Sequence, residues 1–222
     1  MEKHTLGIVG FGGMGNWHRE TIETIDCLSV KGVYDIKKER MDFAEECGLF
    51  AYESLDALLC DPEIDIVLVS TPNDKHKPIA VKALESGKNV VSEKPVTLSL
   101  DDLNEMIAAA EKSGKLFTVH QNRRWDEDFL TVKKIIESGE LGEIFRIESR
   151  VHGSRGIPGD WRQEPEYGGG MIYDWGIHIV DQILMMFEQK PVSVYCTVTN
   201  VTNQLVDDGF TAEFKYENGM TV

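Results

Sequence analysis

Three glycines near the start of the chain, Gly10, Gly12 and Gly15, are spaced Gly-x-Gly-x-x-Gly. They follow an apolar run and precede a helical pattern, as in a turn that binds phosphate groups. Gly10 permits the tight turn, Gly12 lets the backbone approach a pyrophosphate, and Gly15 allows close packing of helix against strand. The spacing predicts a dinucleotide site at the helix N-terminus, and the alternative is a turn whose glycines serve packing alone. The predicted site also includes the residues between these glycines: Phe11, Gly13 and Met14.

Asp35 lies 20 residues beyond Gly15, at the end of the second apolar run. A carboxylate in this place accepts hydrogen bonds from the ribose hydroxyls of a dinucleotide. Because a carboxylate also repels a 2′-phosphate, Asp35 favours NAD as the cofactor. Lys37, Lys38 and Arg40 follow closely; they either form a solvated helix face or, turned toward a 2′-phosphate, favour NADP.

Two polar segments follow later apolar runs, residues 70–73 (Ser-Thr-Pro-Asn) and residues 93–95 (Glu-Lys-Pro). Ligands of doubly wound folds bind at the carboxyl ends of strands, so both segments are candidates for the site. Lys94 stands before a proline, which forces an extended backbone on it. On the sequence alone, the first segment also fits an ordinary turn, and Lys94 also fits a lysine that reaches the surface.

Asp174, His178 and Asp181 recur at i, i+4 and i+7, the spacing that puts three side chains on one helix face. A histidine beside carboxylates suits general-base chemistry near neutral pH. One alternative is a solvated helix face. Another is a metal site, since Asp and His at i, i+4 can share a cation, but no second His or Cys group of suitable spacing supports it, and we predict no metal. The other side of the helix is expected to face the core: Ile177, Val180 and Leu184.

The first 120 residues alternate short β-branched runs with helical patterns. Repeated β-α-β units with short links predict a parallel sheet with right-handed crossovers, covered by helices on both faces. We therefore expect a Rossmann doubly wound α/β domain that binds NAD(P) over residues 1–120. Its expected strands are residues 6–9, 28–34, 64–69, 90–91 and 116–119. Its expected helices, each closed by a glycine, are residues 37–47, 78–86 and 101–113, the last with Ser99 as N-cap.

Beyond about residue 121 the pattern changes, which predicts a second domain over residues 121–222. We expect an α+β substrate and catalytic domain with a mostly antiparallel open sheet. Its expected strands are residues 144–151, 192–201 and 210–216, and its expected helices are residues 129–137 and 171–187. The last residues have the pattern of the start of another strand, so we expect this domain to be incomplete.

Composition excludes several classes of protein. The chain has 23 Lys and Arg against 38 Asp and Glu, a net charge of −15, which excludes nucleic acid and anionic membrane surfaces as partners. Four scattered cysteines without a Cys-x-x-Cys pair indicate reduced thiols. With no apolar run of membrane-spanning length and no signal-peptide pattern, we expect a cytoplasmic protein.

Taken in order, these motifs resemble the Gfo/Idh/MocA family of NAD(P)-dependent oxidoreductases, the group of glucose-fructose oxidoreductase and inositol dehydrogenase. The matching segments are residues 10–15, 70–76, 93–95 and 168–181. The resemblance covers essentially the whole chain, although the family's members are longer, so a C-terminal truncation is expected. Residues 122–126 and Trp161-Arg162 are similar to those of the subgroup with scyllo-inositol dehydrogenases.

The resemblance implies a set of site residues. Glu93 would reach the nicotinamide ribose, the Lys94–Pro95 bond would be cis, and Trp161 would stack on nicotinamide or sugar unless it is a core plug. The residues implied to line the pyrophosphate and nicotinamide are Thr71, Pro72, Asn73 and His76. The residues implied to be catalytic are Lys94, Asp174 and His178.

The implied reaction is hydride transfer between nicotinamide and a secondary alcohol of a sugar, polyol or inositol. His178 would take the hydroxyl proton, Lys94 would stabilise charge on the reacting oxygen, and Asp174 would orient that oxygen. Two alternatives remain: a sugar lyase or hydrolase that uses transient oxidation by NAD, and a non-catalytic dinucleotide sensor. We also expect a homo-oligomer, formed through the exposed sheet of the second domain.

Overall fold

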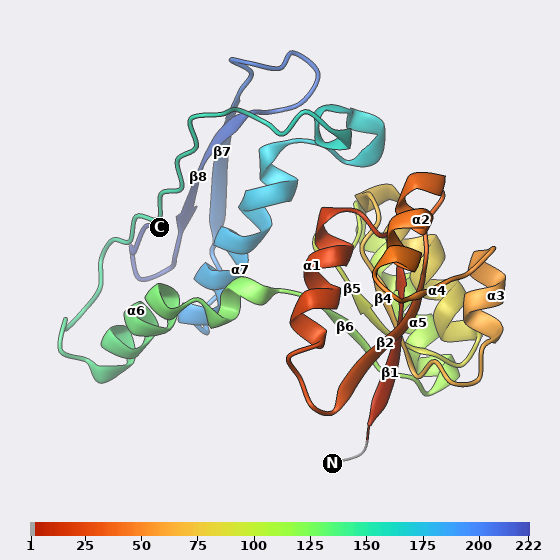
Figure 1. The fold of residues 1–222 in the computed structure, drawn as a ribbon. Helices are drawn as coiled ribbons and strands as arrows, with labels where there is room; N and C mark the ends of the chain where they lie inside the picture. The colour runs from red at the N-terminus through yellow and green to blue at the C-terminus, as the bar shows by residue number, and fades with distance from the viewer. Residues whose placement is uncertain (1–2) are drawn as a thin grey trace. The chain divides into compact units, whose positions relative to one another are not determined.

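The computed structural model describes residues 3–222 and divides into two compact units, Met1–His120 and Gln121–Val222 (Figure 1). The first unit holds a six-stranded sheet in the order β3-β2-β1-β4-β5-β6, with every neighbouring pair parallel. This strand order confirms the predicted doubly wound fold. The strands are β1 (His4–Val9), β2 (Leu28–Tyr34), β3 (Phe50–Ala51), β4 (Ile66–Val69), β5 (Asn89–Ser92) and β6 (Phe117–Val119).

Helices cover both faces of this sheet. One buried cluster joins the sheet to α1 and α2 through Ile22 and Ala44, and a second joins it to the other helices through residues such as Leu58, Leu84 and Met106. The strands are therefore buried on both sides, which explains their continuous apolar runs. The helices are α1 (Gly13–Ile22), α2 (Lys38–Glu46), α3 (Leu55–Cys60), α4 (His76–Glu85) and α5 (Leu100–Ser113).

The ends of α5 show how local sequence sets these helices. The Ser99 side chain accepts a hydrogen bond from the Asp102 N–H at 3.1 Å, as predicted for an N-cap. Gly114 ends the helix at φ 63°, a left-handed conformation that glycine adopts without a steric penalty. Replacing such an N-cap with alanine costs about 1 kcal/mol of stability.

Two short elements of the first unit were not predicted. The strand β3 has two residues and pairs with β2 at the sheet edge, so it is too short to show a periodic pattern. The helix α3 has six residues and follows Ser54, whose side chain accepts a hydrogen bond from the Ala57 N–H as N-cap. Neither element carries enough residues for hydrophobic periodicity to reveal it.

The second unit combines two helices with a two-stranded antiparallel sheet (Figure 1). Ile183 of α7 packs with Phe214, Tyr216 and Met220 in its core. The predicted helices and the antiparallel pair are confirmed, with a π-helical turn, Ile172–Gly176, at the start of the second helix. The elements are α6 (Glu127–Ser138), α7 (Ile177–Met186), β7 (Ser193–Thr199) and β8 (Gly209–Lys215).

Two expectations for this unit are wrong. Residues 144–151 do not form a strand; their described pairing is one bridge from Arg146 to Thr221, because an alternating pattern forms a strand only where a neighbouring strand continues beside it. Leu184, expected in the core, is 49% exposed, whereas Ile183 is buried. Because α7 is apolar on most sides, its hydrophobic pattern does not identify the face that is buried. Packing against the sheet determines that face.

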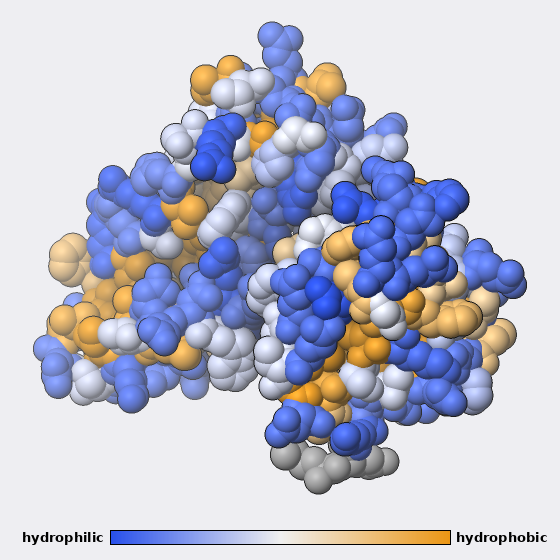
Figure 2. Space-filling view, in the orientation of Figure 1, coloured by the Kyte–Doolittle hydropathy of each residue, from blue (hydrophilic) through white to orange (hydrophobic). Residues whose placement is uncertain are grey.

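Exposed apolar side chains are concentrated in the second unit. On β7 they include Val194 at 56%, Tyr195 at 70% and Val198 at 52% exposure. Figure 2 shows further apolar residues over and beside α6, where Leu130 and Ile135 are exposed. Among residues 3–222, no helix is both long enough and apolar enough to cross a membrane.

Candidate active site

The glycine turn joins β1 to α1 and packs against the end of β4. Gly10 has φ +89°, and a Cβ there would lie 2.7 Å from the Ser70 carbonyl oxygen. A Cβ on Gly15 would lie 2.2 Å from the Gly10 carbonyl oxygen, so protein packing requires both glycines. Gly12 differs, because a Cβ there would meet nothing within 4 Å. Packing therefore does not require glycine at Gly12, which lies in open space at the N-terminus of α1, the kind of position where backbone N–H groups can receive a phosphate.

Asp35 lies at the end of β2 and is bonded to the glycine turn. Its carboxylate accepts hydrogen bonds from the Phe11 N–H at 2.7 Å and from the Lys37 N–H at 2.9 Å. Each carboxylate oxygen has lone pairs left for a ribose hydroxyl. The Phe11 ring is fully buried in the core, so this residue offers the site its backbone alone. Lys38 forms an exposed ion pair with Asp42 at 2.7 Å.

Thr71 brings an unsatisfied hydroxyl next to the glycine turn. A Cβ on Gly10 would lie 2.9 Å from the Thr71 methyl carbon. The Thr71 Oγ1 is buried and finds no hydrogen-bond partner among the described residues. Such a group costs about 1–3 kcal/mol unless a ligand or water satisfies it. Together with the space at Gly12, this hydroxyl fits a bound dinucleotide. Asn73 follows in the same loop and is also buried.

His76 is fully enclosed, with both ring nitrogens on backbone carbonyls. Nδ1 lies 2.8 Å from the Pro95 oxygen, and Nε2 lies 3.0 Å from the Thr71 oxygen. Burial lowers the pKa of His76, although the two carbonyls oppose this shift. The predicted contact with a cofactor stays a prediction, but the ring itself lies between two loops and not on an open surface.

Lys94 is half-buried, and its bond to Pro95 is cis, as the resemblance implied. The preceding Glu93 is buried and accepts hydrogen bonds from His18 Nε2 at 2.7 Å, His120 Nδ1 at 3.0 Å and the Lys94 N–H at 3.1 Å. Burial alone would raise the pKa of Glu93, but the hydrogen bonds from His120 and His18 outweigh it and hold this pKa well below its usual range. The carboxylate predicted to reach a ribose is thus already bonded to two imidazoles.

Sequence reasoning missed His18 and His120. They lie 75 and 27 residues from Glu93 along the chain, so no local spacing reveals the cluster. One ligand atom from each of the three residues lies within 4.8 Å of the others, a spacing that a metal ion tolerates. Both imidazoles, however, meet the same Glu93 oxygen at hydrogen-bond distance, so hydrogen bonding accounts for the arrangement.

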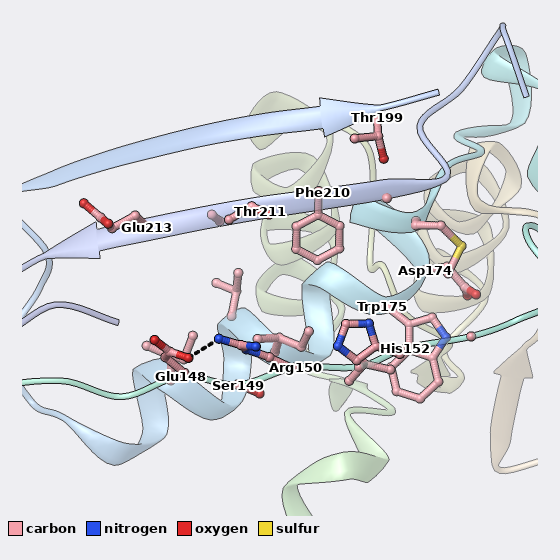
Figure 3. A pocket seen from close by; sticks show the side chains of 18 of the residues that line it. Glu148, Ser149, Arg150, His152, Asp174, Trp175, Thr199, Phe210, Thr211 and Glu213 are labelled. Atoms are coloured by element: carbon pink, nitrogen blue, oxygen red, sulfur yellow. Dashed lines mark hydrogen bonds and ion pairs between the residues drawn. The ribbon is translucent and has the colours of Figure 1, made fainter. Parts of the chain in front are cut away.

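In the second unit, Asp174 lies in the π-helical turn and faces a cavity of about 1040 Å³. Figure 3 shows this cavity between β8 and residues 148–152, with Asp174 and Trp175 at one end. An ion pair joins Asp174 Oδ1 to Arg162 Nε at 3.3 Å. The Arg162 guanidinium also lies 4.5 Å from the centre of the half-buried Trp161 ring.

His178 is buried on α7 and lines a second, smaller cavity of about 400 Å³. The Trp175 ring lies edge-on at 6.1 Å from its ring, and the Arg123 guanidinium lies 4.3 Å from Trp175. Asp181 instead pairs with Arg124 through two hydrogen bonds of 2.7 and 2.8 Å. The three residues predicted on one face thus have different surroundings. A π-helical turn changes the angle between successive side chains, and no sequence pattern marked it.

The contacts of Asp207 explain why Gly170, the last of three consecutive glycines before this turn, is a glycine. The Asp207 carboxylate accepts hydrogen bonds from the Met171 and Ile172 N–H groups at 3.0 and 2.9 Å. A Cβ on Gly170 would lie 2.3 Å from Asp207 Oδ1. Glycine at this position therefore lets a distant carboxylate cap the start of the helix that carries Asp174.

A parallel sheet with this strand order, a glycine turn and an acid at the end of β2 defines a Rossmann protein of the NAD-binding class. The comparison with known families agrees. Residues 4–121 match the model of the oxidoreductase family with an NAD-binding Rossmann fold, and residues 129–222 match the GFO/IDH/MocA C-terminal domain. The chain belongs to the GFO/IDH/MocA family of oxidoreductases, as the motifs indicated.

Several relatives have similar sequences or structures. An uncharacterized oxidoreductase of Schizosaccharomyces pombe is 41% identical over 74% of this chain and 45% of its own length. The scyllo-inositol 2-dehydrogenase (NADP(+)) of Bacillus subtilis is 32% identical over 82% of this chain and 51% of its own. An NAD-binding protein from Listeria innocua has a TM-score of 0.97 and 48% identity, covering 99% of this chain and 65% of that one. The chain spans about half the length of the curated relatives it matches.

Proposed function

We propose that the chain is the NAD-binding and catalytic part of a dehydrogenase that oxidises a secondary alcohol of a sugar, polyol or inositol. The observation that carries the proposal is the open space at Gly12, beside the N-terminus of α1. Asp35 is bonded to the neighbouring Phe11 N–H, and Thr71, whose methyl group lies against Gly10, has an unsatisfied buried hydroxyl. Two relatives support the substrate class: the scyllo-inositol dehydrogenase above and a myo-inositol 2-dehydrogenase of Thermotoga maritima, 28% identical.

The residues of the first unit would hold the cofactor as follows. The backbone at Gly12 and the first N–H groups of α1 receive the pyrophosphate. Asp35 accepts from the adenosine ribose hydroxyls, and Thr71 donates from its buried hydroxyl. When bound, NAD supplies the acceptor for the substrate's hydride. We propose NAD over NADP because a 2′-phosphate beside Asp35 would be repelled.

Three residues are proposed to act on the substrate. Lys94 donates a hydrogen bond to the reacting oxygen and stabilises the negative charge that develops there. His178 accepts the hydroxyl proton as general base. Asp174 orients the same hydroxyl, and its ion pair with Arg162 fixes the carboxylate for this role. Trp161, with one side near Arg162, is the candidate to stack on the sugar ring or nicotinamide.

The test is a screen of the 222-residue chain for NADH and NADPH formation with inositols, aldoses and linear polyols. Titration calorimetry with each dinucleotide accompanies the screen. We expect tighter binding of NAD than of NADP, and accumulation of NADH with at least one cyclic or linear polyol. Turnover of a sugar without accumulation of free NADH would indicate a lyase or hydrolase reaction instead of net oxidation. Binding of NAD without turnover of any substrate would favour a sensor.

A further inference from the structure

His76 joins two loops that leave the same edge of the sheet. It is the first residue of α4, and its side chain is fully enclosed. Its Nε2 contacts the carbonyl of Thr71, in the loop after β4, at 3.0 Å. Its Nδ1 contacts the carbonyl of Pro95, in the loop after β5, at 2.8 Å. One rigid ring therefore spans the gap between the two loops.

The ring's chemistry makes this link specific. A backbone carbonyl only accepts hydrogen bonds, so each contact requires an N–H on the ring side. A neutral imidazole donates to one carbonyl at a time, so in that form the ring is bonded to one loop and packs against the other, whereas the protonated ring donates to both. Because the site is buried, no water replaces either bond at low cost. An apolar side chain of similar size would fill the space but would not connect the loops.

The two loops carry different parts of the proposed site. The loop after β4 carries Thr71 and Asn73, which we assign to the cofactor, and the loop after β5 carries Lys94. We infer that His76 is a positioning residue that sets the distance between the cofactor loop and Lys94. The inference rests on the proposed function, because it takes the role of Lys94 from there.

The backbone on the other side of Lys94 is already fixed. Glu93 is buried and bonded to His18, His120 and the Lys94 N–H. The loop is thus held before Lys94 by a carboxylate cluster and after it by His76. Removing His76 should free one end of this short segment and leave the sheet intact, so the effect is expected to be local.

The experiment compares two substitutions at His76 with a matched control, all in the 222-residue chain. His76→Leu removes both contacts, whereas His76→Gln keeps an amide with two N–H donors. The control is Lys88→Met. Lys88 is also buried, at 8% exposure, and its ammonium donates to the carbonyls of Asp61 and Ile64 at 2.7 and 2.8 Å. Lys88 precedes β5, whereas Lys94 follows it, so the control removes buried hydrogen bonds to two backbone carbonyls at the opposite end of the strand.

Three quantities are measured: hydrogen exchange of the segment 93–97, the affinity for NAD, and the rate of hydride transfer. For His76→Leu we expect exchange in this segment to rise about tenfold, the factor that corresponds to one lost hydrogen bond. We expect kcat to fall by up to about 10²-fold, the effect of a misplacement near 1 Å, with KM and NAD affinity changed far less. His76→Gln should recover part of both losses, and Lys88→Met should leave exchange in residues 93–97 unchanged.

Unchanged exchange and kcat in His76→Leu would overturn the inference, as would an equal effect of Lys88→Met, which would indicate a general loss of stability. If His76→Leu does not fold, His76→Asn replaces it, because its shorter amide cannot reach both carbonyls. If the parent chain transfers no hydride, the proposed function fails. The exchange data then still decide whether His76 holds the Lys94 loop, so the two failures are distinguishable.

Discussion

At the scale of single residues, we propose that Asp35 sets the preference for NAD over NADP. Its carboxylate is held by the Phe11 and Lys37 N–H groups, so its charge has a fixed place beside the glycine turn. We expect Asp35→Ala to narrow or reverse a preference for NAD over NADP, with a change in the ratio of dissociation constants of about tenfold or more, which is ~1.4 kcal/mol.

Calorimetric titration with both dinucleotides measures this ratio. Asp35→Asn is the matched control, since it removes the charge but keeps an oxygen that accepts a backbone N–H. If the parent chain binds NADP as tightly as NAD, the assignment is wrong, and Lys37 and Arg40 become the candidates to bind a 2′-phosphate.

Substitutions at Lys94 and His178 distinguish an enzyme from a protein that only binds the dinucleotide. If Lys94 stabilises charge that develops only in the transition state, Lys94→Met should lose ~10²–10³ in rate while NAD still binds. His178→Ala should lower the rate by a comparable factor of ~10²–10⁴. It should also abolish the acid limb of the pH–rate profile, where the rate rises as the imidazole loses its proton. Because both residues would act on one oxygen, the losses should not add in the double mutant.

Steady-state rates and NAD titrations of the parent, the two single mutants and the double mutant test these roles. A single mutant that keeps a near-parental kcat contradicts the role of that residue. Loss of NAD binding together with activity would instead indicate that the residue supports the cofactor site.

At the scale of elements, Glu93 links α1, β5 and the end of β6 through His18 and His120. Its pKa lies below its usual value because hydrogen bonds from the two imidazoles outweigh burial. As pH falls, the unfolded chain therefore takes up this proton before the folded chain does. The stabilisation is complete above the unfolded value near 4.5 and is lost as pH falls through the folded-state pKa.

Urea denaturation over a range of pH tests this link. At neutral pH, Glu93→Gln should lower the free energy of unfolding by about 2 kcal/mol, because hydrogen bonds to a charged group are lost. Below about pH 5 the difference from the parent should shrink. The control is Glu63→Gln, whose side chain is exposed beside Lys31 and should change stability by less than ~1 kcal/mol. A pH-independent difference between Glu93→Gln and the parent would contradict the assignment.

At the scale of the whole molecule, the exposed sheet of the second unit predicts self-association. Val194 and Val198 lie on the same face of β7 and are each more than half exposed. Apolar side chains that stay exposed on one face of a strand commonly pack against a second copy of the chain. Lysine at both positions should therefore shift the chain toward the monomer, whereas Thr197→Lys, on the opposite face of the strand, should not. Light scattering on dilution measures the change, and a parent chain that is monomeric at every concentration would contradict it.

Local sequence determined most of the elements of this protein and the glycine turn that we propose as part of its cofactor site. The parallel strands follow from β-branched runs, and the ends of α5 follow from Ser99 and Gly114. The turn at Gly10 and the place of Asp35 follow from spacing within one β-α-β unit. These features were predictable because each depends on backbone conformations and capping groups within a few residues, or on one crossover of known handedness.

The tertiary structure alone decided which side chains meet. It brought His18 and His120 to Glu93 across 75 and 27 residues, and it joined Asp207 to the helix that carries Asp174. It also left residues 144–151 without a strand partner beyond one bridge. Such contacts depend on how the elements pack together. The hydrophobic pattern of a sequence shows which face of an element is apolar, but it does not show which element packs against that face. For this reason most of the elements were predictable, whereas the buried hydrogen-bond network around Glu93, next to Lys94, was not.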